Sequence, residues 1–141
     1  MTIVKELNDK LSVAPQISVD EIKDLAAQGY RTLILNRPEG ETPDQPPNAD
    51  IEAAAREAGM RFLYIPLVSG YFPDETLEEF KKAYKFEQTK ILAYCRSGMR
   101  SACLWAIAEA GTSGTDAVLE KAAEAGFNIA GIRMLIDQHS D

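Results

Sequence analysis

The chain has little of the chemistry that histidine and cysteine supply: one histidine and two cysteines in 141 residues. His139 is two residues from the C-terminus. Neither a Cys/His catalytic pair nor a histidine metal site is therefore expected, and we predict no metal and no cofactor. Cys95 and Cys103 are eight residues apart and do not form the framework of a disulfide-rich secreted domain. We expect a reducing, cytoplasmic setting.

Positive charge and long apolar runs are also scarce. Fifteen Lys and Arg residues stand against 22 Asp and Glu residues, which gives a net charge of −7. This balance argues against nucleic acid or an anionic membrane as a general partner. No apolar run is long enough for a transmembrane helix, and the N-terminus does not resemble a signal peptide. The length is that of one ordinary domain, which we place at residues 1–141.

Segments with strand patterns alternate with segments of helical period along the chain. A small edge hairpin is expected at residues 3–14, and longer strands at 30–35, 61–65 and 91–94. Helices are expected at 19–28, 50–58, 75–84, 101–110, 115–125 and 129–138, with residues 111–114 as a break. The alternation predicts an α/β fold of three layers, in which helices flank a mainly parallel central sheet.

Two long loops separate these elements. Residues 36–48 hold four of the seven prolines, and residues 66–74 form a second irregular stretch. Ligands of such sheets bind beyond the carboxyl ends of the strands. We therefore expect these two loops to meet the loop that follows residues 91–94.

That third loop is the most informative segment: residues 91–101 read ILAYCRSGMRS. A short apolar strand delivers Cys95 to a glycine-containing turn, and a helix follows at once. Inward-pointing backbone N–H groups, the positive end of the helix dipole, and Arg96 and Arg100 all favour a thiolate. Cys95 is thus the expected nucleophile. Cys103 could be a resolving thiol, although a small buried apolar residue is the simpler interpretation.

Other residues could complete the site. Arg37 follows a strand and could bind an anionic substrate; its structural alternatives are a solvated loop arginine or a partner of Glu39 or Glu41. Ser69 and Asp74 could reach the same rim, with a turn residue and a helix cap as their structural alternatives.

The loop resembles the phosphate-binding loop of dual-specificity phosphatases and, more closely, the Cys-Arg-Ser-Gly-x-Arg-Ser loop of single-domain rhodaneses. The whole chain resembles the phosphatase-like domain of the beta-lactamase-hydrolase-like proteins, through residues 11–16, 36–41, 64–66 and 94–101. The resemblance implies a dual-specificity or tyrosine-phosphatase-like fold. It implies that Cys95 is the nucleophile and Arg100 the closing arginine of an anion-binding cradle. The other cradle residues are Arg96, Ser97, Gly98, Met99 and Ser101.

Three departures from the phosphatase pattern bear on the reaction. Four residues rather than five separate Cys95 from Arg100, Tyr94 replaces a histidine, and Ser69 lies near the position of the general acid. Transfer of sulfur from thiosulfate needs no acid, whereas ester hydrolysis usually does.

We therefore expect a sulfurtransferase that forms a persulfide on Cys95. A phosphatase with a phosphocysteine intermediate is the alternative, and a non-catalytic anion-binding module is a third interpretation. The expected substrate is a small anion or sulfane-sulfur compound, and the resemblance implies a persulfide-dioxygenase-type partner.

Overall fold

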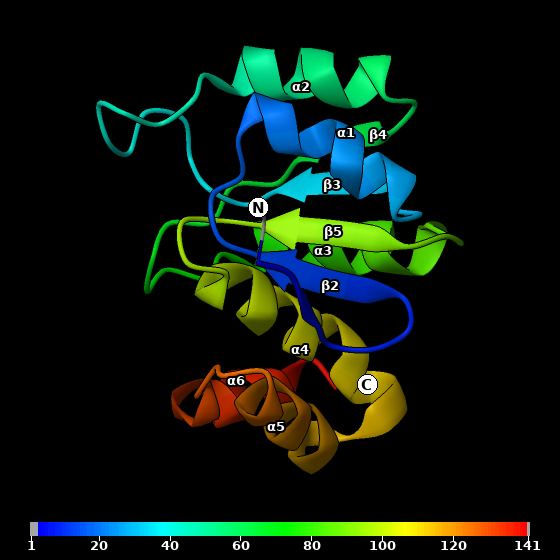
Figure 1. Cartoon of the computed structure of the whole chain (residues 1–141). Helices are drawn as coiled ribbons and strands as arrows, with labels where there is room; N and C mark the ends of the chain where they lie inside the picture. Colours follow the sequence, from blue (N-terminus) through cyan, green and yellow to red (C-terminus); the bar gives the residue numbers. More distant parts are fainter. Residues whose placement is uncertain (1–2, 141) are drawn as a thin grey trace.

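The computed structural model describes residues 3–140, and a five-stranded sheet lies at its centre (Figure 1). The strand order is β1-β2-β5-β3-β4, and only β1 is antiparallel to its neighbour. The bounds are β1 Lys5–Glu6, β2 Leu11–Ala14, β3 Thr32–Leu35, β4 Arg61–Tyr64 and β5 Ile91–Tyr94. The parallel strands end level with one another, because Ala14, Leu35 and Tyr64 share the register of Tyr94 through successive pairs.

Helices cover both faces of the sheet, which confirms the predicted three-layer α/β fold. Helices α1 (Val19–Ala27) and α2 (Asn48–Glu57) cover one face. Helices α3 (Asp74–Phe86) and α4 (Met99–Ser113) cover the other, and α5 (Thr115–Glu124) and α6 (Arg133–Gln138) pack outside α4. Alternate residues of each strand enter opposite cores: Leu92 and Tyr94 lie with α1 and α2, and Ala93 with α3 and α4.

Helix α4 is longer than the sequence predicted. Its residues are apolar on all sides, and it is buried between the sheet and the outer helices, with Trp105 among its buried residues. Gly111 was expected to break the chain, but the helix runs through it to Ser113 and ends at Gly114, where φ is +94°. Tertiary packing outweighs the cost of about 1 kcal/mol that glycine carries inside a helix.

Most other predicted elements are confirmed with shifted ends. Helix α2 begins at Asn48 rather than Asp50, and α3 at Asp74 rather than Glu75. The predicted capping box is present, with the Glu21 carboxylate accepting the Ser18 N–H at 2.8 Å. The C-terminal segment is not one helix: a 3₁₀ turn, η1 (Ala130–Ile132), precedes α6.

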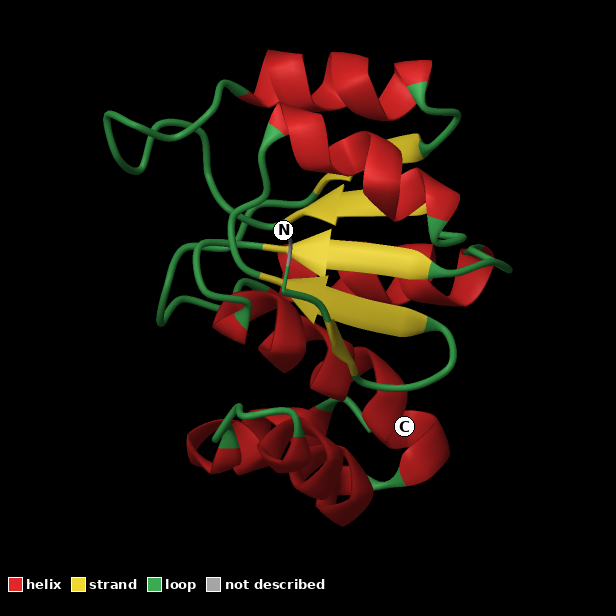
Figure 2. Ribbon diagram, viewed as in Figure 1, coloured by secondary structure: helices red, strands yellow, loops and turns green. Residues whose placement is uncertain are grey.

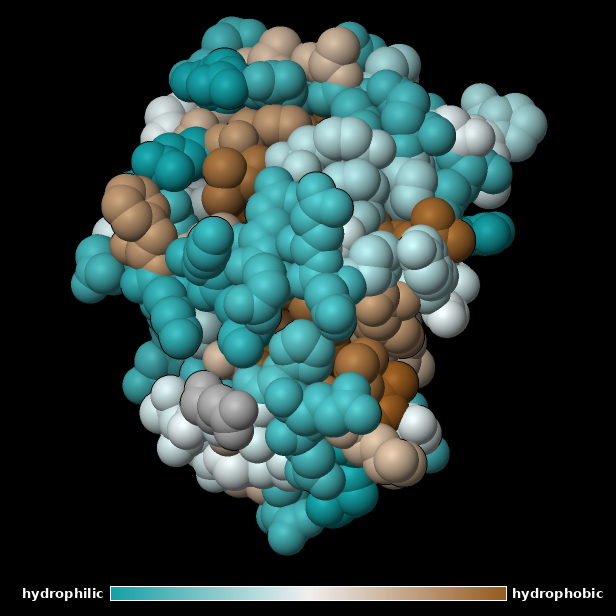
Figure 3. Space-filling model, turned by 180° about the vertical axis from the view of Figure 1, so that it is seen from behind, coloured by the Kyte–Doolittle hydropathy of each residue, from teal (hydrophilic) through white to brown (hydrophobic). Residues whose placement is uncertain are grey.

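The loops that follow β2, β3, β4 and β5 gather at one edge of the sheet (Figure 2). This confirms the predicted meeting of the three loops. The rear face is mainly hydrophilic, and its apolar residues form separate small groups (Figure 3). Within residues 3–140, no helix combines the length and apolarity needed to cross a membrane.

Candidate active site

Cys95 leaves β5 and enters a turn that closes over its own sulfur. The residue is 0 % exposed, and its Sγ accepts the backbone N–H of Gly98 at 3.1 Å. Gly98 has φ +95° and precedes α4, a left-handed conformation that glycine adopts without strain. A Cβ at this position would lie 3.0 Å from Cζ of Phe127. The turn therefore requires glycine for its backbone angle and for its packing.

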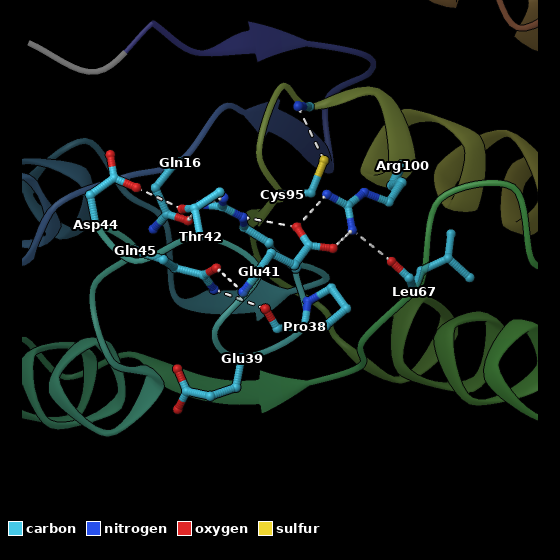
Figure 4. A network of polar contacts seen from close by, with 12 residues as sticks. Gln16, Pro38, Glu39, Glu41, Thr42, Asp44, Gln45, Leu67, Cys95 and Arg100 are labelled. Atoms are coloured by element: carbon cyan, nitrogen blue, oxygen red, sulfur yellow. Dashed lines mark hydrogen bonds and ion pairs between the residues drawn. The ribbon is translucent and has the colours of Figure 1, made fainter.

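Arg100 projects from the first turn of α4 and is nearly buried. Its Nη1 donates to Oε2 of Glu41 at 2.7 Å and to the carbonyl oxygen of Leu67 at 2.8 Å. Its Nη2 donates to Oε1 of Glu41 at 2.9 Å, which completes a two-pronged ion pair (Figure 4). Arg100 thus joins the loop after β5 to the loops after β3 and β4. Arg100, the predicted closing arginine, is therefore at the site, and its guanidinium is paired with the Glu41 carboxylate.

Arg37 belongs to the same network. Its Nε donates to Oε1 of Glu41 at 3.0 Å, and its side chain is only 4 % exposed. Its other two nitrogens donate to Gln16 Oε1 at 2.9 Å and to Thr42 Oγ1 at 3.1 Å. The pairing of Arg37 with Glu41, one of the two structural alternatives, is confirmed. A contact between Arg37 and substrate stays a prediction.

The Glu41 carboxylate is ionised by its surroundings. Hydrogen bonds from Arg100, followed by those from Arg37, hold the pKa of Glu41 below its ordinary value of 4.5. Conversely, Glu41 raises the pKa of Arg100, and the neighbouring Cys95 acts in the same direction. A carboxylate in this state accepts hydrogen bonds and cannot act as a general acid.

A buried polar cluster aligns the loops beneath these charges. Asn36 donates from its side chain to the carbonyl oxygen of Ile65 and accepts the hydroxyl of Ser101, both at 2.8 Å. Its backbone N–H donates to the Tyr94 carbonyl at 2.9 Å, and its own carbonyl accepts the Leu67 N–H at 2.8 Å. Ser101 is therefore at the site as predicted, but its hydroxyl is bonded to Asn36.

Three other predicted cradle residues, Arg96, Ser97 and Met99, lie at the surface of the site. Arg96, Ser97 and Met99 are exposed on the loop, where the Ser97 hydroxyl accepts the Met99 N–H at 3.3 Å. Arg96 borders a polar hollow of about 180 Å³, whose other lining residues are Gln16, Arg37, Thr42, Asp44, Gln45 and Pro46.

Ser69 and Asp74 are not brought to the cysteine by any described contact. Ser69 is exposed in its loop, and the Asp74 side chain is 90 % exposed and lies 3.7 Å from Nε2 of His139. Cys103 is buried in α4, and burial raises its pKa to about 12, which confirms the simpler interpretation of that residue.

Sequence reasoning did not assign a role at the site to three residues of the network. Glu41 was considered only as a partner of Arg37, and Gln16 and Asn36 only as parts of segments. A carboxylate four residues after Arg37 was a usable signal, but its bond to Arg100 spans 59 positions and had none.

The family model of the beta-lactamase hydrolase-like protein, phosphatase-like domain, matches residues 4–112. The chain belongs to this family. Among curated relatives, the beta-lactamase hydrolase-like proteins of Xylella fastidiosa (strain Temecula1) and Agrobacterium fabrum are 33 % and 31 % identical over 106 and 104 residues. These matches cover 75 % and 74 % of this chain but only 25 % and 24 % of the relatives, so the chain spans about a quarter of their length.

Solved structures share the phosphatase-like fold over almost the whole chain. A candidate phosphatase of Neisseria meningitidis is 29 % identical, with a TM-score of 0.82 and 96 % of each chain covered. PTPMT1 is 16 % identical, with a TM-score of 0.77, 97 % of this chain covered and 94 % of that chain. At the latter identity the likeness concerns the fold alone. Together these matches show a phosphatase-like domain with the fold of these structures.

Proposed function

We propose that this domain is a sulfurtransferase that carries a persulfide on Cys95. The observation that supports the proposal is the state of the one carboxylate bonded into the cradle. Glu41 is held ionised by Arg37 and Arg100, and so it cannot protonate a leaving alcohol. Among residues 3–140, no described contact brings another acid to Cys95, since Asp74 lies beside His139.

The reaction is balanced without a proton donor. The Cys95 thiolate attacks the outer sulfur of thiosulfate, the S–S bond breaks, and sulfite leaves with the electron pair. The Cys95 persulfide then has one negative charge. An acceptor thiolate attacks its outer sulfur, which forms the acceptor persulfide and restores the Cys95 thiolate. The Gly98 N–H and the Arg100 guanidinium are placed to stabilise the anionic sulfur at each stage.

An acceptor thiol must approach the buried sulfur of Cys95. The polar hollow that Arg96 borders is a candidate acceptor site at the rim: Arg96 supplies positive charge at its edge, and Cys95 does not line it. A persulfide-dioxygenase-type partner, as the family resemblance implies, would consume the acceptor persulfide.

Hydrolysis of phosphate esters is the second candidate. The comparisons favour it, because the family is described as phosphatase-like and the related structures are named as phosphatases. In that reaction Cys95 would attack phosphorus, Arg100 would bind two phosphoryl oxygens, and water would hydrolyse the phosphocysteine.

Intact mass spectrometry after thiosulfate treatment separates the two. We expect the mass of one sulfur atom on the protein, its loss on addition of a thiol, and no gain in Cys95→Ser. Cys103→Ser is the matched control and should gain sulfur like the unmodified chain. An unchanged mass, together with turnover of an aryl phosphate, would establish the phosphatase instead.

A further inference from the structure

We propose that Glu41 is the specificity residue of this site: its carboxylate occupies Arg100 and Arg37 and so disfavours a phosphoryl group on Cys95 relative to a persulfide. This inference rests on the proposed sulfur transfer and assigns the residue that selects it.

The first support is the geometry of the ion pair. Both Glu41 oxygens accept from the fork of Arg100, at 2.7 and 2.9 Å, which is how a guanidinium binds two oxygens of a phosphate. Oε1 also accepts from Nε of Arg37 at 3.0 Å. The carboxylate therefore stands where a phosphoryl group would find its two cationic partners, and Arg100 donates its remaining Nη1 bond to Leu67.

The second support is that the loop is built to hold this carboxylate. The Glu41 N–H donates to Oε1 of Gln45, and Nε2 of Gln45 donates to the carbonyl of Pro38, at 2.8 and 2.9 Å. Thr42 accepts from Arg37 and donates to Asp44 (Figure 4). Glu41 is 26 % exposed, so its position is fixed by these bonds rather than by deep burial.

The third support is the difference between the two groups that Cys95 could carry. A phosphoryl group bonded to Cys95 holds three charged oxygens next to its sulfur, where they would face the Glu41 carboxylate and like charges repel. The charged oxygens of thiosulfate lie one sulfur atom further from Cys95 and leave with sulfite, so the persulfide keeps only one charge beside the Gly98 N–H and Arg100. Removal of the Glu41 charge should therefore open the cradle to phosphate.

The test measures binding of inorganic phosphate through the protection of Cys95 from alkylation. The unmodified chain should bind phosphate with a dissociation constant above about 1 mM. Glu41→Gln should bind at least about tenfold more tightly, because two arginines gain free donors and a like charge is removed. Glu39→Gln is the matched control: it makes the same charge change in the same loop, but the Glu39 carboxylate accepts the Asn48 N–H and no described bond joins it to Arg37 or Arg100. The affinity of this variant for phosphate should change less than about twofold.

A second variant separates charge from loop structure. Glu41→Asp keeps the charge and should leave phosphate binding weak. Equal gains in Glu41→Asp and Glu41→Gln would mean that loop packing controls the site and would overturn the proposal. Sub-millimolar phosphate binding by the unmodified chain, which needs no variant, would also overturn it. If the domain does not transfer sulfur, its mass stays unchanged after thiosulfate treatment. That result is separate from phosphate binding, so the proposed sulfur transfer and the proposed role of Glu41 are tested by different measurements.

Discussion

At the scale of single residues, the two cysteines differ in what surrounds their sulfur atoms. Cys95 accepts a backbone N–H and lies beside Arg100, whereas burial among apolar side chains raises the pKa of Cys103 to about 12. We predict that iodoacetamide at pH 8 modifies Cys95 first and leaves Cys103 unmodified in the folded protein. Peptide mapping after short exposures checks this order. Equal labelling of both in the native state would mean that α4 opens readily.

The two buried arginines should also differ. Arg100 is bonded to Glu41 and interacts electrostatically with Cys95, whereas the side-chain bonds of Arg37 go to Glu41, Gln16 and Thr42. We predict that Arg100→Ala lowers kcat by about 10²–10³-fold, the cost of a lost transition-state contact. Arg37→Ala should mainly raise KM.

Steady-state sulfur transfer by variants that are folded by circular dichroism provides the comparison. Equal losses of kcat would place Arg37 in direct contact with the reacting atoms.

At the scale of elements, the junction between β5 and α4 depends on the left-handed turn at Gly98. Ala at this position must adopt φ +95°, at a cost of about 1–2 kcal/mol, and its Cβ would press on Phe127. We predict that Gly98→Ala lowers stability by more than this backbone cost and removes the hydrogen bond to Cys95.

Gly59→Ala is the control, because Gly59 follows helix α2 with φ +81° and has no atom within 4 Å of an added Cβ. It should lose only the backbone contribution to stability and keep its activity. Urea unfolding and sulfur-transfer assays measure both effects. Activity in Gly98→Ala equal to that of Gly59→Ala would show that the cradle tolerates a reshaped turn.

At the scale of the whole molecule, two buried groups, Tyr84 of α3 and Cys103 of α4, contribute to the dependence of the free energy of unfolding on alkaline pH. Burial raises the pKa of Tyr84 from 10.0 to about 12 and that of Cys103 from 9.0 to about 12. Both groups are neutral in the folded state, so their contribution to stability is complete below about pH 9 and is lost as pH rises toward 12.

We predict a fall in the free energy of unfolding between pH 9 and pH 12, and a shallower fall in Tyr84→Phe and in Cys103→Ala. Tyr71→Phe, at an exposed tyrosine, is the control and should follow the unmodified chain. Urea titrations at several pH values measure the slopes. Parallel curves for all variants would assign the alkaline limb to other groups.

The sequence by itself determined the layers and the position of Cys95 at the end of a strand. Alternating apolar periods, the prolines of residues 36–48 and the run around Cys95 are local signals, and local signals predict α/β order, loop positions and a cysteine at a strand end. They also predicted the loops that would meet, because parallel strands share a carboxyl edge. Helix ends were less accurate, as at Gly111, because the modest cost of one glycine inside a helix is too weak to end α4 by itself.

Only the tertiary structure decided how the site is charged. Arg100 and Glu41 are far apart in the chain, and no periodicity or spacing connects them. Their pairing follows from the common register of β3 and β5, which brings the two loops to one edge, and from the hydrogen bonds that fix the Glu41 loop. A residue's type is written in the sequence, but the charge it meets depends on which chain segments the fold brings within hydrogen-bond distance.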